Sequence, residues 1–247
     1  KYGVSNNTRG AIEIFQMPEK NREGDIYRDR YIIGHDPVDN DQAESSSLSS
    51  TFVLDLFTDT IVAEYTGRHD YSEDNYEVCR LLCLFYNAKC LYESNKKGLF
   101  AYFSKMNCTH LLADTPEYLR DKQLVKYSSF GSNSKGVNAS AAINNYANER
   151  IREWLLKPVI TQVVEDGVPK EVTMPNLFTI KSRALLEELI AYTPELNVDR
   201  IRALGMVMLY REEKMILFQN KVTEDRYKDS SYLGNDDFFN RNYRRRQ

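Results

Sequence analysis

The sequence has few of the side chains that build soft-metal centres. It contains only three histidines and four cysteines in 247 residues, the histidines are far apart, and no two cysteines form a CxxC pair. This pattern argues against a Cys/His zinc site. We expect the cysteines to be reduced thiols of an intracellular protein. Cys79 and Cys83, four residues apart, are expected on one face of a buried helix.

Long apolar runs are also missing. No segment approaches the roughly 18–20 apolar residues that a membrane-spanning helix needs, and the N-terminus does not have the pattern of a signal peptide. We therefore expect no membrane association. The chain begins at Lys1 rather than at Met, so we expect it to be an excised part of a longer protein.

A strongly basic field is absent, because the formal net charge is -3. This weakens a nucleic-acid-binding interpretation without excluding it, since a local patch can be sufficient. The phosphate-binding pattern GxxxxGK[ST] is absent too: residues 131–136 hold one Lys and two Gly, but at the wrong spacing. We interpret that stretch as a surface loop or a loop near DNA, and we expect no ATP hydrolysis from this chain.

The composition that remains, 42% hydrophobic and 28% charged residues, is that of an ordinary soluble globular protein. Its first half begins with an arm or linker over residues 1–28, which includes one short alternating run. Three apolar segments then predict strands joined as an antiparallel meander. After these segments the apolar residues recur at every third or fourth position instead of every second one, and the sequence then predicts alternating helices and strands. The expected elements are strands over 30–36, 51–56 and 61–65, a helix from Ser72 or Asp74 to 86, a strand over 88–93, a helix over 95–106 and a short strand over 110–113.

The second half is predicted to be mainly helical after a turn-rich segment over 114–137. A main domain over residues 29–218 and a basic, flexible tail over 219–247 complete the expected organisation. This order predicts an α/β fold with a mixed sheet and helices packed on it. The expected elements are a helix capped by Asn138 and stopped by Pro158, a hairpin insertion over 160–174, and helices over 180–192 and 197–211.

Three acids stand at the ends of expected elements. Asp36 ends an apolar strand before a proline, Glu93 ends a second strand, and Asp199 begins a helix that is apolar on most sides. Rigid elements hold functional groups in fixed positions. Carboxylate oxygens, completed by substrate phosphates, are the ligands that Mg²⁺ or Mn²⁺ prefers. The three acids are therefore candidate ligands of a site that hydrolyses phosphodiesters with two metal ions.

Each acid also has a simpler interpretation. Asp36 can be a turn residue, Glu93 a solvated strand end, and Asp199 a residue that interacts with the helix dipole. Five basic residues could meet phosphates or could simply be solvated. These candidate DNA-binding residues are Lys96, Lys97, Lys135, Arg200 and Arg202.

Several of these segments, in this order and spacing, resemble the nuclease domain of the large terminases of tailed bacteriophages. The similarity extends from about residue 10 to about residue 212. Each motif is weak alone, but the ordered series is fairly specific. The segments are YIIGHDP (31–37), IVAEYTG (61–67), Tyr86-Asn87, YESNKKG (92–98) and NVDRIRA (197–203).

The resemblance implies an RNase H-like fold, with a central mixed sheet (an antiparallel meander plus parallel strands) flanked by helices. It implies a metal-dependent endonuclease that cuts concatemeric double-stranded viral DNA during genome packaging. The family's metal ligands fall on Asp36, Glu93 and Asp199, with Asn95 expected to support Glu93 and Gly98 to allow close packing. Implied partners are double-stranded DNA, an upstream ATPase domain absent from this chain, the portal protein and the small terminase, in the host cytoplasm at the procapsid.

The chain departs from the family pattern in two places. The last motif carries a lone Asp199 where relatives often have paired acids, and residues 129–139 match only loosely. Two alternatives stay open: another RNase H-like nuclease of the resolvase or transposase type, and a DNA-gripping or portal-docking module that does not cut.

Overall fold

The computed structural model describes residues 11–39, 47–125, 134–165, 168–193 and 198–233. The chain divides into two compact units, residues 1–211 and residues 212–247. Within the described residues, no helix is both long and apolar enough to cross a membrane.

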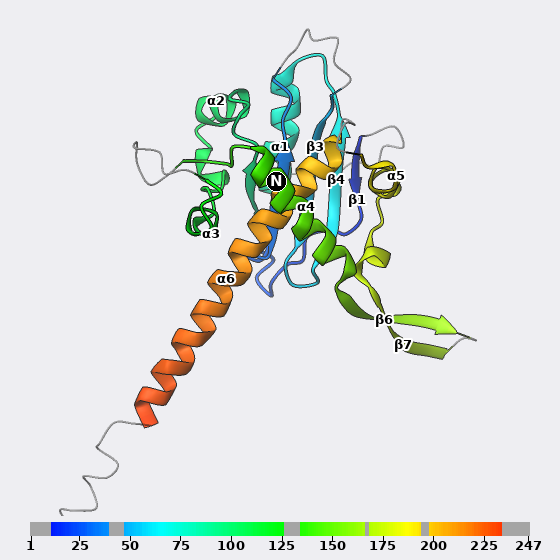
Figure 1. Cartoon of the computed structure of the whole chain (residues 1–247), viewed down its shortest axis with the longest axis vertical. Helices are drawn as coiled ribbons and strands as arrows, with labels where there is room; N and C mark the ends of the chain where they lie inside the picture. The colour runs from blue at the N-terminus through cyan, green and yellow to red at the C-terminus, as the bar shows by residue number, and fades with distance from the viewer. Residues whose placement is uncertain (1–10, 40–46, 126–133, 166–167, 194–197, 234–247) are drawn as a thin grey trace, which may run out of the picture. The chain divides into compact units, whose positions relative to one another are not determined.

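The first unit is built on a five-stranded mixed sheet with the strand order β1-β4-β3-β2-β5 (Figure 1). Neighbouring strands are antiparallel except β2 and β5, which run parallel. This confirms the predicted α/β class, the antiparallel meander and the mixed sheet. The strands are β1 (Ile12–Ile14), β2 (Tyr31–Asp36), β3 (Ser49–Asp55), β4 (Thr60–Gly67) and β5 (Lys89–Tyr92).

Strand β2 is buried along its whole length because helices cover both faces of the sheet. Side chains alternate along a strand, so Tyr31 and Ile33 point to one face and Ile32 and Gly34 to the other. A strand covered on both sides is expected to read as a continuous apolar run, and this explains the YIIG segment.

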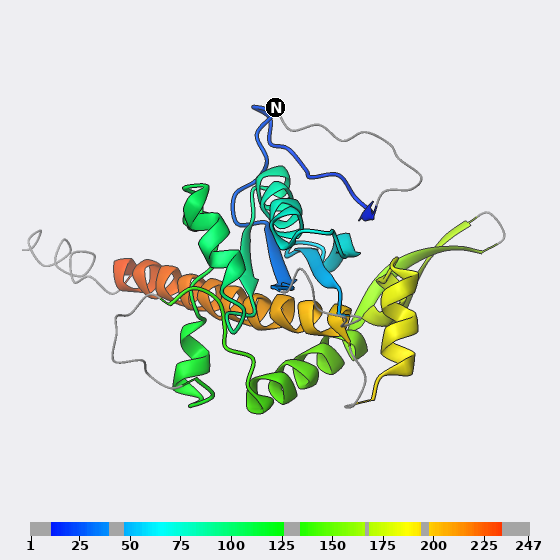
Figure 2. The same cartoon turned by 90° about the horizontal axis from the view of Figure 1, so that it is seen from above.

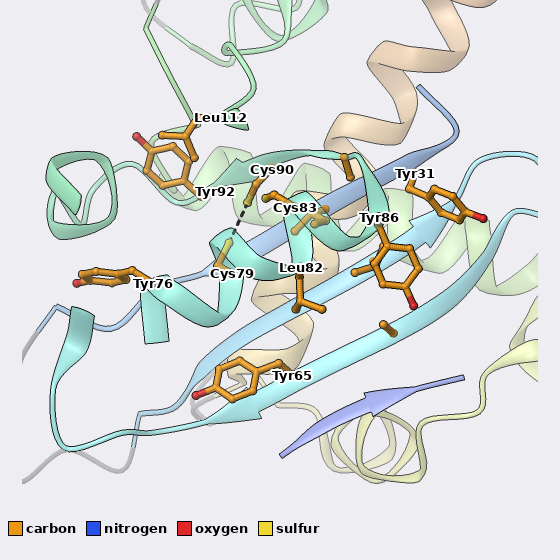
Figure 3. Close-up of a cluster of buried hydrophobic side chains, with 14 of the residues drawn as sticks. Tyr31, Tyr65, Tyr76, Cys79, Leu82, Cys83, Tyr86, Cys90, Tyr92 and Leu112 are labelled. Atoms are coloured by element: carbon orange, nitrogen blue, oxygen red, sulfur yellow. Dashed lines mark hydrogen bonds between the residues drawn. The ribbon is translucent and has the colours of Figure 1, made fainter. Parts of the chain in front are cut away.

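Helix α1 (Ser72–Tyr86) covers the first face, as Figure 3 shows in close-up. Its buried positions repeat at three and four residues, as predicted. Tyr31 of β2 meets Tyr86 of α1 edge-on, with ring centroids 5.2 Å apart. The thiols of Cys79 and Cys90 lie 3.7 Å apart in this core, and all four cysteines are free, as expected.

Helix α6 (Asp199–Leu233) covers the opposite face with its first turns, and helix α4 (Ala141–Leu156) packs against it there (Figure 2). The contact between α6 and β2 is a backbone contact. A Cβ atom on Gly34 would collide with the backbone nitrogen of Val207 and the carbonyl oxygen of Ala203. Only a residue without a side chain lets the helix approach β2 this closely.

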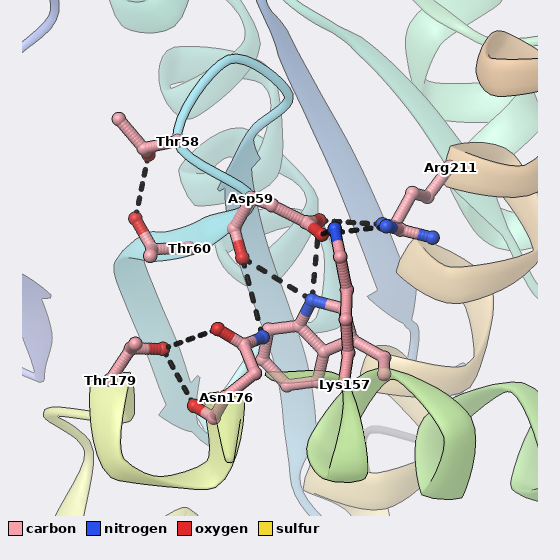
Figure 4. A network of polar contacts seen from close by, with 8 residues as sticks. Thr58, Asp59, Thr60, Lys157, Asn176, Thr179 and Arg211 are labelled. Atoms are coloured by element: carbon pink, nitrogen blue, oxygen red, sulfur yellow. Dashed lines mark hydrogen bonds and ion pairs between the residues drawn. The ribbon is translucent and has the colours of Figure 1, made fainter. Parts of the chain in front are cut away.

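A polar network around Asp59 ties four segments of the first unit together (Figure 4). Asp59 lies in the turn between β3 and β4. Arg211 of α6 donates to both of its carboxylate oxygens at 2.6 Å, and Lys157 donates to Oδ2 at 2.7 Å. The indole nitrogen of Trp154 in α4 donates to Oδ1 at 3.2 Å, and Asn176 reaches the Asp59 carbonyl at 3.5 Å. The network fixes α4 and α6 to the far end of the meander.

Most of the remaining elements follow the predicted order with shifted boundaries, but the short helix α3 lies in a segment that was expected to be turn-rich and the 3-10 turn η2 was not predicted. Ser140, not Asn138, caps α4, because its hydroxyl accepts from the backbone nitrogen of Ile143. The predicted strand over 110–113 is wrong: it is a 3-10 turn followed by one bridge between Cys90 and Leu112. These elements are α2 (Gly98–Lys105), η1 (Thr109–Leu111), α3 (Glu117–Asp121), β6 (Pro158–Glu165), β7 (Val168–Pro175), η2 (Asn176–Thr179) and α5 (Arg183–Ala191).

Three regions of the predicted organisation fall at least partly within the described residues. Residues 12–14, expected in an N-terminal arm, add β1 to the sheet edge. Residues 219–233, expected in a basic tail, belong to α6, which continues because residues 206–233 contain neither Gly nor Pro. Strands β6 and β7 pair antiparallel where a hairpin insertion over 160–174 was predicted, and residues 166–167 lie outside the described part of the chain. Residues 234–247 lie outside the described part of the chain.

We expect Gly34→Ala to lower the free energy of unfolding by about 2–3 kcal/mol, because the added methyl group meets helix backbone that cannot rotate away. Gly205→Ala is the matched control in α6: its Cβ would lie 3.2 Å from one methyl carbon, that of Ala147. Helix propensity favours Ala there by up to about 1 kcal/mol. Urea denaturation of both variants provides the measurement, and equal stability of the two would contradict the close-contact argument.

We expect Asp59→Asn to lower the free energy of unfolding at pH 7 by about 1–3 kcal/mol. Burial raises the pKa of Asp59, but its bonds and charge interactions with Arg211 and Lys157 outweigh this and lower the pKa below its ordinary value. The stabilisation is therefore complete above the unfolded-state pKa of about 4 and is lost as pH falls through the lower folded-state value.

Denaturation of parent and variant between about pH 7 and pH 2 measures this effect. The difference between the two should shrink toward zero at the acidic end. Asp70→Asn, at an exposed position, serves as the control and should match the parent throughout. A difference for Asp59→Asn that stays constant with pH contradicts the assignment.

Candidate active site

The first predicted ligand, Asp36, is the last residue of β2 and is only 3% exposed. By strand alternation its side chain lies on the same face as Gly34, the face that α6 covers. Pro37 follows and ends the strand. Asp36 is thus a carboxylate that the covered strand holds below the surface, rather than a residue of a turn.

Glu93 reaches the same edge of the sheet. Strands β2 and β5 are parallel, so their carboxyl ends lie side by side. The backbone nitrogen of Glu93 donates to the carbonyl of His35 at 3.2 Å, which joins the two strand ends directly. On its other side Glu93 forms a parallel bridge with Val137.

Lys96 lies between these two acids. Its Nζ atom is 2.7 Å from Oδ1 of Asp36 and 4.0 Å from Oε2 of Glu93. The two carboxylates therefore already face one shared cation. The sequence suggested Lys96 as a DNA-binding residue; its side chain points instead toward the acids.

Asp199, the third predicted ligand, begins α6. Its Oδ2 atom accepts a hydrogen bond from the backbone nitrogen of Leu48 at 2.7 Å. This bond links the start of α6 to the segment that enters β3. The contact of α6 with Gly34 holds this end of the helix near the strand that carries Asp36.

The charges of the four groups influence one another. Burial raises the pKa of Asp36 to about 7; Lys96 opposes this increase and Glu93 adds to it. Burial also raises the pKa of Asp199, where the Leu48 amide opposes the increase and Asp36 contributes to it. Burial lowers the pKa of Lys96, but the negative charges of Asp36, Glu93 and Asp199 outweigh this and raise it overall.

The donor chemistry of this cluster fits a hard divalent cation, because all candidate ligands are carboxylate oxygens. Lys96 shows that a positive charge is stable between Asp36 and Glu93. In this arrangement, however, no group of three His, Cys, Asp or Glu side chains among the described residues is positioned to hold a metal ion. The Lys96 ammonium, 2.7 Å from Oδ1 of Asp36, stands where a cation would meet that carboxylate.

A buried ion pair holds the first turn of α6. Arg200 donates through Nε to Oε1 of Glu64 in β4 at 2.7 Å, and its Nη1 lies 3.5 Å from Oε2 of Glu188 in α5. Glu188 also accepts from the backbone nitrogen of Ile201 at 3.0 Å. Arg200 and Glu64 thus clamp the turn that carries Asp199. Arg200, suggested as a DNA-binding residue, faces two carboxylates.

Sequence reasoning did not single out Glu64, although it lies in the IVAEYTG segment. The available signal was an acid in the middle of an apolar strand, since a buried acid requires a partner. Glu64 is 4% exposed and also accepts from Thr66 at 3.1 Å, and Thr66 in turn contacts Ser50 at 3.0 Å. Ser50 is the register partner of Asp36, so the polar contacts extend across the sheet from Glu64 toward the candidate site.

The two predicted supporting residues both stabilise the segment after β5. Asn95 exchanges hydrogen bonds with the backbone of Ala139, at 3.1 and 3.4 Å, rather than with Glu93. Gly98 begins α2, where its nitrogen donates to Oδ2 of Asp39 at 3.1 Å. A Cβ atom on Gly98 would collide with the Tyr76 hydroxyl.

The other suggested DNA contacts are spread over the surface. Lys97 is exposed and Arg202 partly exposed. Lys135 forms an ion pair with Asp114 at 2.8 Å and donates to the carbonyl of Leu112 at 3.0 Å. A role for these residues toward DNA stays a prediction.

Over 81–82% of its length the chain is similar to nuclease structures of bacteriophage large terminases. The large terminase nuclease from thermophilic phage G20c with bound zinc shares 16% identity over 81% of this chain and 88% of that chain, with a TM-score of 0.44. The same nuclease with bound magnesium shares 13% identity over 82% of this chain and 88% of that chain, with a TM-score of 0.41. The Thermus phage P74-26 large terminase nuclease domain shares 15% identity over 81% of this chain and 85% of that chain, with a TM-score of 0.36.

At these identities and TM-scores, the similarity does not establish a shared function. No family model matches the sequence, and no curated protein matches it. The functional conclusion therefore depends on the geometry of the acids.

We expect Arg200→Gln to lower the free energy of unfolding by about 1–3 kcal/mol, because it leaves the buried Glu64 carboxylate without its ionic partner. Arg202→Gln, two residues along the same helix, should stay within about 0.5 kcal/mol of the parent. Urea denaturation at pH 7 compares the two. Equal effects of both substitutions would mean that Arg200 does not clamp α6.

Proposed function

We propose that this chain is a divalent-metal-dependent DNA endonuclease, the nuclease domain of a viral terminase large subunit. One observation supports the proposal above the others. Asp36, a buried carboxylate at the end of a central strand, faces the same cation as Glu93 and interacts electrostatically with Asp199. A buried acid cluster at the carboxyl end of a rigid sheet is more costly than a fold requires, and perturbed acids of this kind concentrate at functional sites.

In this proposal Asp36, Glu93 and Asp199 hold Mg²⁺ or Mn²⁺, with two ions during cleavage. The ions, when bound, supply the positive charge that activates a water molecule and stabilises the charge developing on the scissile phosphate. The chain contributes fixed ligand positions: Asp36 on a strand buried from both faces, and Asp199 on a helix held by the Leu48 amide and the Arg200–Glu64 pair. Lys96 neutralises the acids while no ion is bound.

The finer biological assignments are part of the proposal and rest on the ordered motif series. The substrate is concatemeric double-stranded DNA, cut during packaging at the procapsid in the host cytoplasm. The partners are an upstream ATPase domain, the portal protein and the small terminase. Hydrolysis of ATP belongs to that upstream domain.

We expect the chain to nick supercoiled plasmid in the presence of Mn²⁺, with weaker activity in Mg²⁺ and none in EDTA. Asp36→Asn, Glu93→Gln and Asp199→Asn should each reduce the nicking rate by about 100-fold or more, because loss of a ligand exceeds the roughly 10- to 100-fold effect of losing a supporting group. Agarose-gel assays of initial rates provide the measurement.

Asp70→Asn, the exposed acid, is the control and should cut at the parental rate. Equal nicking by the parent and Asp36→Asn would refute the proposed site. Absence of nicking by the parent at high protein concentration, together with salt-sensitive DNA binding that survives loss of the acids, would instead identify a non-cutting DNA-gripping module.

A further inference from the structure

A pocket of about 450 Å³ is lined by residues that neighbour Glu93 in the chain and includes none of the proposed metal ligands. Two of its lining residues, Tyr92 and Ser94, flank Glu93 in the chain. Tyr92 is the last residue of β5, and by strand alternation its side chain points to the opposite face from that of Glu93. The pocket is therefore lined by the residues on either side of a proposed metal ligand. A volume of this size is in the range of small-molecule sites, about 300–1,000 Å³.

The chemistry of the pocket differs from that of the rest of the chain. The described residues that line it include two lysines, two aromatic rings and, with that of Tyr92, four hydroxyl groups, but no acid, in a protein with a net charge of -3. Another pocket, of about 580 Å³, has three acids in its lining, Asp39, Glu73 and Asp74. Lysines and hydroxyls bind phosphate and sugar oxygens, and aromatic rings stack on bases. The lining therefore suits a nucleotide.

The walls of the pocket are fixed by backbone contacts. Residues 134–137 run beside the end of β5, where Val137 donates to the Tyr92 carbonyl at 2.9 Å and Ser94 donates to the Val137 carbonyl at 2.9 Å. Gly136 has φ +74°, and a Cβ atom there would lie 2.7 Å from the Tyr92 carbonyl oxygen. Thr115 anchors the same segment through Ser134, with an Oγ1–Oγ distance of 2.8 Å. The pocket is thus preformed.

Two of the lining residues, one in α2 and one just before it, are exposed and can contact a ligand. Phe100 is 43% exposed although it is a large apolar ring, and Lys97, the residue before α2, is exposed. Lys135 on the opposite wall is already paired with Asp114, so it contributes less charge. Phe100 offers a face for stacking, and Lys97 offers a cation for a backbone phosphate.

We propose that this pocket binds one unpaired nucleotide of a DNA strand, next to the phosphodiester at the acid cluster. Bases within a duplex cover each other's faces, so only an unpaired base can stack on Phe100. The site therefore recognises a single-stranded end or an opened base pair adjacent to the cut. The inference rests on the proposed function in taking DNA as the ligand, but binding at the pocket does not require cleavage.

The test compares the affinities of a labelled 12-nucleotide single strand and a 12-base-pair blunt duplex, by fluorescence anisotropy in EDTA. We expect Phe100→Ala to weaken single-strand binding about 5- to 100-fold, Phe100→Trp to preserve it, and both to leave duplex binding within about 2-fold of the parent. Lys97→Gln should reduce the slope of log affinity against log salt concentration for single-strand binding by about one, which corresponds to the loss of one phosphate contact.

Phe178→Ala and Lys181→Gln are matched controls, because both side chains are exposed and remote from the pocket lining. Unchanged single-strand affinity of Phe100→Ala, or equal loss for single strand and duplex, would overturn the proposal. The anisotropy assay contains no divalent ion, so it does not depend on cleavage. The plasmid assay alone tests the nuclease proposal, and the anisotropy assay alone tests the pocket proposal.

Discussion

The structure depends on the contact between the backbone of β2 at Gly34 and the backbone of α6 at Ala203 and Val207. A side chain at position 34 would push helix and strand apart by about the width of a methyl group. Such a shift would also change the separation between Asp36, two residues beyond Gly34 on the strand, and Asp199, one turn before Ala203 on the helix. The same glycine therefore sets both the packing of the core and the spacing of two candidate ligands.

The cost of bringing these acids together is offset by positive charge from the chain itself. Lys96 pairs with Asp36, and Arg200 pairs with Glu64 and Glu188. The two cations differ in how readily each can leave its carboxylate partners. Arg200 lies in a closed set of contacts and stabilises the first turn of α6. Lys96 has a side chain that is one-third exposed and flexible. In the proposed metal site its ammonium and a divalent ion would compete for Asp36, so metal affinity would depend on the position of this one side chain.

Much of the fold could be predicted from the sequence because its signals are local. The apolar runs of β2, β3 and β4 and the three-to-four spacing in α1 follow from side-chain period alone, and a proline after Asp36 marks a strand end. Boundaries that depend on capping, such as Ser140 at α4, were less predictable, because Asn138 is an equally good cap by type. The 3-10 turn at Thr109–Leu111 was mistaken for a strand because short apolar runs carry no clear period.

The candidate site was predictable only in part, since its acids stand at element ends but its partners come from elsewhere in the chain. That Asp36 and Glu93 lie on neighbouring strand ends follows from the parallel pairing of β2 and β5. That Lys96 turns back to Asp36, and that Arg200 meets Glu64 from a position 136 residues distant in sequence, depends on tertiary packing and has no local signature. Basic residues next to acidic motifs are therefore ambiguous in sequence: the same lysine or arginine that suggests a phosphate contact can be the counter-charge that allows the acids to be buried. In this chain Lys96 and Arg200 have their charge directed inward, while Lys97 remains directed to solvent beside Phe100, and this division separates the residues that maintain the acid cluster from those that can meet a nucleic-acid ligand.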